Sequence, residues 1–408
     1  MRILVQKFGG ASLATAANRQ HVVDKIGKAR DEGFQPVVVV SAMGQRGDPY
    51  ATDTLIDMVR KPYPLVARRE IDVVMCCGEL LSAALMTSTL QAAGLDALLF
   101  TGGQAGILTD TQFGNARILK VDPIRIRDTL SSGQIPVVCG CQGITADGDM
   151  TTLGRGGSDT TASALGAALS AEAIEIYSDT EGIMTADPRL APHAHILDRI
   201  SYEEASQLAS QGANVIHPRA VDFARHKNIP LIVKSIFSDT PGTLITSAAN
   251  AAEVVDTRIS DRVATGITYV KNISQITVRK DDCSMPVEGF RIFKLLAASG
   301  INVDFINILP VQLLFTVQDD DLEIARQHLT SAGYQLNITM NCAKVSVVGG
   351  GMGDVPGVMA SFVESFTAKG IPLLQTVDSQ TSISALIDGQ YLETAVSSLH
   401  SQFGLDKT

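Results

Sequence analysis

Near-continuous apolar segments alternate with helical patterns through the first 245 residues, and this alternation constrains the fold more than any other feature. Val and Ile dominate the apolar segments, as in "PVVVVSAM" at 36–43. Strands of this kind are buried on both faces, and helical crossovers provide the cover. The sequence therefore predicts an α/β fold in which a mostly parallel sheet lies in an αβα sandwich. The expected strands are 2–8, 36–43, 96–100, 135–140, 173–179 and 230–236, and the main helices are 18–33, 70–94, 158–171 and 201–212.

A polar segment at 246–262 separates this region from an internal repeat. "PVEGFRIFKLLAASGINV" begins at residue 286, and the matching "PGVMASFVESFTAKGIPL" begins at residue 356. Each copy predicts a loop, an amphipathic helix that ends at a glycine, and a strand. The first copy completes a βαββαβ pattern over 272–341, whereas the second, over 342–408, lacks one strand. We therefore expect the strand-like segment 263–271 to pair with the strand near 344–350.

Composition excludes several classes of partner. The chain has 43 acidic and 33 basic residues, with a net charge of −10 and no basic stripe, so we expect no nucleic-acid or membrane partner. Apolar runs are of strand length and the N-terminus does not resemble a secretion signal, which favours a cytoplasmic protein. The six cysteines form no CxxC pair and no cluster with metal-ligand spacing. We expect reduced thiols and no dedicated metal site.

The first predicted strand ends in "KFGG" at residues 7–10. Gly9 and Gly10 allow main-chain amides to approach an anion closely, and Lys7 adds a positive charge beside them. This pattern favours phosphate binding at the end of the strand, although the Walker A spacing is absent. An ordinary strand-to-helix turn is the alternative interpretation.

A second glycine-rich motif, "TTLGRGGSDTTA", precedes a predicted helix at 158–171. Ser158 is a good N-cap residue, and Asp159 suits the first helical turn. Arg155 lies between glycines, where its guanidinium can bind a carboxylate through two hydrogen bonds. The alternative is a capped glycine turn, which would explain Asp159 but not Arg155.

Two further motifs place polar groups in unusual positions. Glu79 interrupts an apolar helical pattern in "CCGELLS", and a carboxylate there is costly unless it meets a cation. A glutamate that reaches the surface or an interface is the alternative. "YSDTEGIMTADPR" at 177–189 places Asp179 at the carboxyl end of a strand, although it could be a simple turn cluster. We interpret His193, His195 and His217 as structural.

Together these motifs resemble those of aspartate kinase, a member of the amino-acid kinase family, in its single-function form with two C-terminal ACT domains. The resemblance covers essentially the whole chain and implies a catalytic domain at 1–245, a linker at 246–262, a first ACT domain at 272–341, and a second at 263–271 plus 342–408. The motifs that carry it, in family order, are "KFGG", "SAMG" (41–44), "FGNARI" (113–118), "TTLGRGGSDTTA" (151–162), "YSDTEG", "TADPR" and "HPRAV" (217–221).

The resemblance implies transfer of the γ-phosphoryl group of ATP to the β-carboxylate of L-aspartate. Lys7 and Asp179 would be catalytic: Lys7 would neutralise charge on the transferred group, and Asp179 would orient Lys7 or the magnesium-nucleotide. Arg155 would bind the α-carboxylate of aspartate, and Glu79 with Asp159 would bind its ammonium group. Thr52 and Ser158 complete the implied aspartate site. The implied nucleotide site comprises Lys7, Phe8, Gly9, Gly10, Ser178, Asp179, Met184, Arg189 and Asn214, with Mg²⁺ carried by ATP.

The resemblance also implies feedback regulation by lysine, threonine or diaminopimelate, and a homo-oligomer formed through the ACT domains. The implied effector residues are Ser284, Met285, Asn302, Asp304, Met352 and Asp378. The alternatives are an amino-acid kinase that acts on acetylglutamate, glutamate or carbamate, and a catalytically silent amino-acid sensor. Glu79 and Asp159 together favour a substrate with a free ammonium group, which an acetylated amino acid lacks. A nicotinamide oxidoreductase is disfavoured because the glycine fingerprint is missing.

Overall fold

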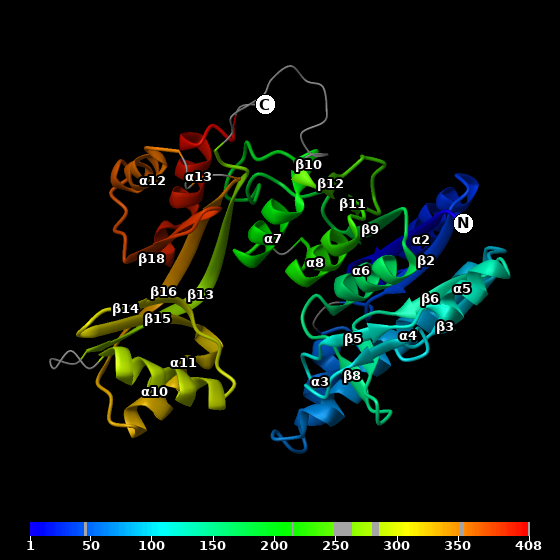
Figure 1. The fold of residues 1–408 in the computed structure, drawn as a ribbon, viewed down its shortest axis with the longest axis horizontal. Helices are drawn as coiled ribbons and strands as arrows, with labels where there is room; N and C mark the ends of the chain where they lie inside the picture. The colour runs from blue at the N-terminus through cyan, green and yellow to red at the C-terminus, as the bar shows by residue number, and fades with distance from the viewer. Residues whose placement is uncertain are drawn as a thin grey trace. The chain divides into compact units, whose positions relative to one another are not determined.

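The computed structural model describes residues 1–44, 47–213, 215–248, 263–279, 285–350, 352 and 355–406 (Figure 1). These residues form two compact units. The N-terminal unit lies within Met1–Ile183 and Ile196–Ile259, and the C-terminal unit lies within Met184–His195 and Ser260–Thr408.

An eight-stranded sheet forms the centre of the N-terminal unit, in the order β10-β12-β11-β9-β1-β2-β6-β3. Its pairs are parallel except for β11 with β12, which confirms the predicted mostly parallel sheet. Successive residues Val37 to Val40 of β2 are all fully buried, so both faces of the sheet are covered. The strands are β1 (Ile3–Phe8), β2 (Gln35–Val40), β3 (Ala97–Phe100), β6 (Ile135–Cys139), β9 (Ala173–Ser178), β10 (Arg199–Ser201), β11 (Leu231–Ser235) and β12 (Thr243–Thr246).

Helices pack against this sheet, and α4 is the longest of those described. Its side chains Ala83, Met86 and Leu90 share a buried cluster with residues of α2 and the sheet. Among the described residues, α4 is also the one helix long and apolar enough to cross a membrane, but these three residues lie in the core of the unit. The helices are α1 (Gly10–Leu13), α2 (Ala16–Asp31), α3 (Thr52–Arg60), α4 (Arg68–Ala92), α5 (Ile124–Ser131), α6 (Gly157–Leu169), α7 (Tyr202–Ser210) and α8 (Pro218–Lys227).

A small second sheet was not predicted from the sequence. Its order is β5-β4-β7-β8, and its strands have only three or four residues. Such short strands give too few alternations to be distinguished from loops. They are β4 (Ile107–Thr109), β5 (Ile118–Val121), β7 (Gln142–Ile144) and β8 (Met150–Thr152).

The C-terminal unit contains one antiparallel sheet in the order β14-β15-β13-β16-β18-β17. The strands are β13 (Gly266–Arg279), β14 (Asp304–Ile308), β15 (Gln312–Gln318), β16 (Leu336–Val348), β17 (Gln375–Asp378) and β18 (Ser382–Asp388). The helices are α10 (Met285–Ala298), α11 (Asp319–Ser331), α12 (Val358–Thr367) and α13 (Leu392–Gln402), and a short 3₁₀ turn, η2 (Gly389–Tyr391), precedes α13.

The expected pairing of 263–271 with the strand near 344–350 is confirmed, because Gly266 to Val270 pair with Val348 to Lys344. The sequence pattern was wrong, however, in dividing each long strand into two. β13 and β16 each run through both repeats without a break. Asn272 and Asn341 lie at their register shifts with φ of +60° and +57°. These bulges interrupt the alternation of side chains, which explains the apparent gap in the sequence.

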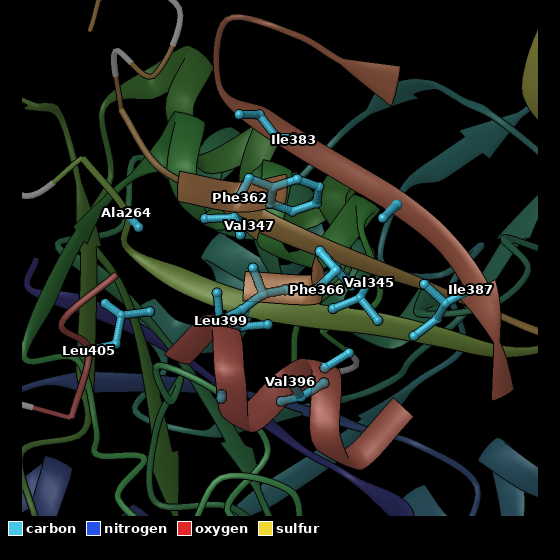
Figure 2. Close-up of a cluster of buried hydrophobic side chains, with 14 of the residues drawn as sticks. Ala264, Val345, Val347, Phe362, Phe366, Ile383, Ile387, Val396, Leu399 and Leu405 are labelled. Atoms are coloured by element: carbon cyan, nitrogen blue, oxygen red, sulfur yellow. The ribbon is translucent and has the colours of Figure 1, made fainter. Parts of the chain in front are cut away.

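A buried cluster joins α12 and α13 to β13, β16 and β18 (Figure 2). Phe362 and Phe366 of α12 pack edge to face with ring centroids 5.0 Å apart, and both are almost fully buried. Ala186 and Ala191 join the same cluster, although they follow β9 in the sequence. Residues 184–195 are therefore part of the C-terminal core.

Replacing Phe362 with Ala should destabilise the C-terminal unit by about 3–5 kcal/mol, because it leaves a cavity in a closed core. Hydrogen exchange of β16 and β18 amides measures this loss locally, since two units need not unfold together. Val363→Ala on the same helix is the control, because Val363 is 36% exposed. Equal exchange in the two variants would contradict the proposed role of the Phe362 ring.

Candidate active site

The candidate site lies at the carboxyl ends of four adjacent strands, β9, β1, β2 and β6. In open α/β sheets, ligands bind beyond this edge. β1 ends at Phe8, and α1 starts at Gly10. A Cβ on Gly10 would lie 2.5 Å from the carbonyl oxygen of Ala42, just beyond β2. Glycine is therefore needed for α1 to start close to the neighbouring strand end.

Phe8 belongs to the core rather than to the surface of the site. Its side chain is fully buried and stacks on Tyr177 of β9 with ring centroids 4.8 Å apart. The predicted nucleotide contact of Phe8 could therefore come only from its main chain. The stack adds a side-chain contact between β1 and β9, which pair in parallel, so Lys7 and Asp179 lie near the same edge of the sheet.

Lys7 and Asp159 form the central ion pair of the site. Lys7 Nζ lies 2.7 Å from Asp159 Oδ1, and the two side chains are only 13% and 10% exposed. Asp159 lies in the first turn of α6, as predicted. In this structure the ion-pair partner of Lys7 is Asp159, and the prediction that Asp179 orients Lys7 or the magnesium-nucleotide stays a prediction. Asp179 is exposed and accepts a hydrogen bond from Ser178 Oγ at 2.9 Å.

The start of α6 differs from the prediction. Ser158 is not the N-cap; Gly156 is, with φ of +65°, and the helix begins at Gly157. A Cβ on Gly140 would lie 2.6 Å from Ser158 Oγ, so the buried hydroxyl instead packs against the end of β6. The helix starts two residues earlier than a Ser158 cap requires, and Gly156 accommodates the left-handed conformation of the cap. Arg155 is exposed and has no ion pair among the described residues.

Glu79 is the buried acid that the helical pattern indicated. It lies on α4 with 4% of its surface exposed, and no described residue donates a hydrogen bond to its Oε2. Burial raises the pKa of this carboxyl to about 7, although hydrogen bonds involving its own main chain, Gln142 and Ala42 oppose the rise. Among the residues that the structure describes, Glu79 thus has no ion pair with a cation, the partner that a buried carboxylate requires. Thr52, half-buried, begins α3.

Part of the predicted nucleotide loop belongs to the C-terminal unit. Thr185 accepts a hydrogen bond from Ile267 N at 2.7 Å through its carbonyl oxygen, and its hydroxyl contacts His400 Nε2 at 2.9 Å. Arg189 binds Asp187 within the loop at 2.7 Å and holds the pKa of that carboxyl at about 2. The nucleotide roles of Met184 and Arg189 stay predictions. Asn214 lies outside the described residues.

The implied effector residues do not gather in one place. Asp304 is on β14 and Asp378 ends β17, and these strands form opposite edges of the sheet. Asp304 pairs with Lys344 at 2.6 Å, whereas Met352 is buried in the core. Their assignment stays a prediction. The other members are Asn302, which is exposed before β14, Met285, the first residue of α10, and Ser284, which lies outside the described residues.

Sequence reasoning missed Asp72, a second buried acid on α4. Its carboxylate accepts hydrogen bonds from the main-chain nitrogens of Gly114 at 2.9 Å and Thr152 at 2.8 Å. The Thr152 hydroxyl adds a third at 2.8 Å. The available signal was its spacing, because Asp72 lies two helical turns before Glu79 on the same face. Among the described residues, no group of three or more His, Cys, Asp or Glu side chains could hold a metal ion.

The raised pKa of Glu79 predicts a pH-dependent stability difference from Glu79→Gln. The folded carboxyl stays neutral up to about pH 7, whereas the unfolded one ionises above about 4.5. The contribution of Glu79 to stability is therefore lost as pH rises between these values. From pH 4.5 to 8, the variant should gain about 3 kcal/mol relative to the original chain.

Urea denaturation of both proteins across this pH range measures the difference. Glu70→Gln in the first turn of α4 is the control, because Glu70 is exposed. A stability difference between Glu79→Gln and the original chain that does not change with pH would show that folding leaves the pKa of Glu79 unshifted.

Sequence comparisons identify relatives over the whole chain. Residues 2–235 match the model of the Amino acid kinase family, and residues 337–401 match an ACT domain model. Aspartokinase 1 of Bacillus subtilis (strain 168) is 44% identical over 407 residues, which cover 100% of each chain. The aspartokinase of Mycolicibacterium smegmatis is 38% identical over 421 residues, covering 99% of this chain and 97% of that relative.

Solved structures agree with these relatives. The aspartate kinase of Synechocystis is 32% identical with a TM-score of 0.55, over 98% of this chain and 69% of that one. The E. coli aspartokinase III structure in complex with aspartate and ADP has a TM-score of 0.80 at 23% identity, over 98% and 99% of the two chains, and shows the shared fold. The chain belongs to the aspartokinases, within the amino acid kinase family.

Proposed function

We propose that this chain transfers the γ-phosphoryl group of ATP to the β-carboxylate of L-aspartate and forms 4-phospho-L-aspartate. This is the first step towards lysine, threonine, methionine and diaminopimelate. Its membership of the aspartokinases supports the reaction. The charge arrangement of the candidate site supports the substrate.

The observation that carries the proposal is the buried acid Glu79, which has no described cation partner, near the strand end that bears Lys7. A buried carboxylate of this kind is stabilised by a positive charge, and an amino-acid ammonium group supplies one. Glu79 lies next to Gly78 on α4, where an added Cβ would lie 3.1 Å from Ala42 Cβ. Ala42 in turn meets Gly10 of the phosphate-binding turn. Ala42 therefore connects the acid on α4 with the glycines that follow Lys7.

The proposed mechanism needs no strong general base, because an ionised β-carboxylate is already a nucleophile. Catalysis then depends on in-line positioning and on neutralising charge at the transferred group. Lys7 would exchange Asp159 for the γ-phosphoryl group, and the released Asp159 would join Glu79 at the substrate ammonium. Arg155, exposed and unpaired among the described residues, would bind the α-carboxylate.

Magnesium bound with ATP would supply charge neutralisation at the phosphate oxygens. The exposed carboxylate of Asp179, at the end of β9, is an oxygen ligand of the kind that Mg²⁺ prefers. We assign Asp179 and Ser178 to the nucleotide side of the site. Lys7 and the main chain of Gly9 and Gly10 would contact the phosphates.

The repeated C-terminal unit supports a proposal for regulation and assembly. We assign the catalytic domain to 1–245, except for residues 184–195, which belong to the C-terminal unit, and the linker to 246–262. A first ACT domain would follow at 272–341, and a second at 263–271 plus 342–408. Lysine, threonine or diaminopimelate would inhibit by binding one ACT arrangement more tightly than another. The sheet-forming ACT domains would also hold a homo-oligomer together.

The reaction is tested by trapping the acyl phosphate with hydroxylamine in the presence of ATP, magnesium and L-aspartate. Formation of aspartyl hydroxamate is the expected result. The same assay with glutamate, acetylglutamate and carbamate tests the other amino-acid kinases. Product from one of these and none from aspartate would contradict the proposed substrate, and no ATP turnover with any acid would favour the silent sensor.

Replacing Lys7 with Ala should lower kcat by on the order of 10²–10³-fold, because one charge partner of the transition state is lost. Steady-state kinetics with saturating ATP and aspartate measure this change. Lys28→Ala is the matched control, since Lys28 is 62% exposed on α2. A kcat within twofold of the original enzyme would remove Lys7 from the catalytic role.

Replacing Arg155 with Ala should raise the KM for aspartate more than it lowers kcat, because the interaction with the α-carboxylate is present in both ground state and transition state. The KM for ATP serves as the internal control and should stay within twofold. An unchanged KM for aspartate would show that another residue binds the α-carboxylate.

A further inference from the structure

We propose that Arg219, at the start of α8, is a positioning residue that holds the Arg155 loop in its substrate-binding conformation. This inference rests on the proposed role of Arg155. Here the Arg155 loop means residues 153–156, which connect β8 to α6. Arg219 would act through this loop without touching substrate.

The guanidinium of Arg219 binds two separate segments of chain. Its Nη1 donates to the carbonyl oxygen of Leu153 at 2.9 Å, and its Nη2 donates to that of Ala116 at 3.0 Å. Nη1 also donates to Asn115 Oδ1 at 3.4 Å. A lysine could not reproduce this fork, because only a planar guanidinium presents several donors in fixed directions.

The sequence of the Arg155 loop does little to restrict its main-chain conformation. Gly154 and Gly156, on either side of Arg155, have φ of +78° and +65°. Glycine populates many backbone conformations, so this segment would sample several positions without outside contacts. The direction of the Arg155 side chain therefore depends on what packs against the two glycines.

Both glycines are covered by the elements that Arg219 joins. A Cβ on Gly154 would lie 2.9 Å from Asn115 Oδ1. A Cβ on Gly156 would overlap the side chain of His217, which caps α8 and accepts a hydrogen bond from Arg219 N at 3.3 Å. His217 therefore has a structural role, as expected: its side chain packs against one side of the Arg155 loop.

Asp72 fixes the residues that precede the loop. It accepts hydrogen bonds from Thr152 and Gly114, and the main chains of these two segments also meet where Ala116 N donates to Thr152 O at 2.9 Å. An acid on α4 and a base on α8 therefore hold the end of β8. Beyond Thr152, the hydrogen bonds of the Arg219 guanidinium restrict the main-chain conformation of the loop.

Replacing Arg219 with Ala should raise the KM for aspartate about 10-fold or more, because a lost charged hydrogen bond is of that size and the loop must be ordered on binding. The KM for ATP should stay within twofold. Arg219→Lys should recover part of the affinity, since it can reach one carbonyl. Arg127→Ala is the matched control, because Arg127 donates to Ala168 O at 3.1 Å, at the other end of α6.

A double-mutant cycle separates positioning from general destabilisation. If Arg219 acts through Arg155, adding Arg219→Ala to Arg155→Ala should raise the KM for aspartate no further. Multiplied effects would overturn the proposal. Equal rises in the KM for aspartate and for ATP would also overturn it.

Hydrogen exchange provides a readout that does not depend on the reaction. In Arg219→Ala, amides of residues 153–157 should exchange at least 10-fold faster, while those of β1 and β2 stay unchanged. Unchanged exchange at 153–157 would overturn the proposal whatever the activity. Failure of the original enzyme to phosphorylate aspartate would instead contradict the proposed function, because this exchange measurement would still report on the loop.

Discussion

The ion pair between Lys7 and Asp159 is the contact on which the rest of the site depends. It joins the end of β1 to the first turn of α6, and both partners are largely buried. Neither charge could be left there alone, because an unpaired buried charge costs several kcal/mol. The pair therefore maintains a compact site without ligands, and binding of an anion at Lys7 and a cation at Asp159 would replace each partner in turn.

Glu79 is a second buried charge-bearing group of the site, but unlike Asp159 it has no cation partner among the described residues. Its burial is unfavourable for the folded chain alone, as the pKa near 7 indicates. The surrounding fold nevertheless holds it in place, since α4 is anchored in the core by Met86 and Leu90. If a substrate ammonium stabilises Glu79, as proposed, binding would be selective for free amino acids over acylated ones.

The sequence predicted those features that produce regular patterns or isolated exceptions to them. The buried strands of the parallel sheet follow from runs such as Val37–Val40, and Glu79 was visible because it interrupts an apolar helix. Three-dimensional contacts decided the rest. The partner of Lys7 could not be predicted, because two acids were plausible. Asp159 follows a glycine-rich turn and Asp179 follows a strand, and neither local pattern shows which of them reaches Lys7. The bulges at Asn272 and Asn341 interrupt the alternation of side chains, so β13 and β16 were each predicted as two shorter strands. Thr185 and Ala186 belong to the C-terminal core through contacts with β13 and α13, which no local pattern reports.

The most direct test of the account is a crystal structure with aspartate and a non-hydrolysable ATP analogue. The account predicts that Lys7 Nζ moves from Asp159 to the γ-phosphate, that Glu79 and Asp159 contact the aspartate ammonium, and that Arg155 binds its α-carboxylate. An ammonium group bound elsewhere, with Lys7 still paired to Asp159 in the presence of the nucleotide, would contradict it.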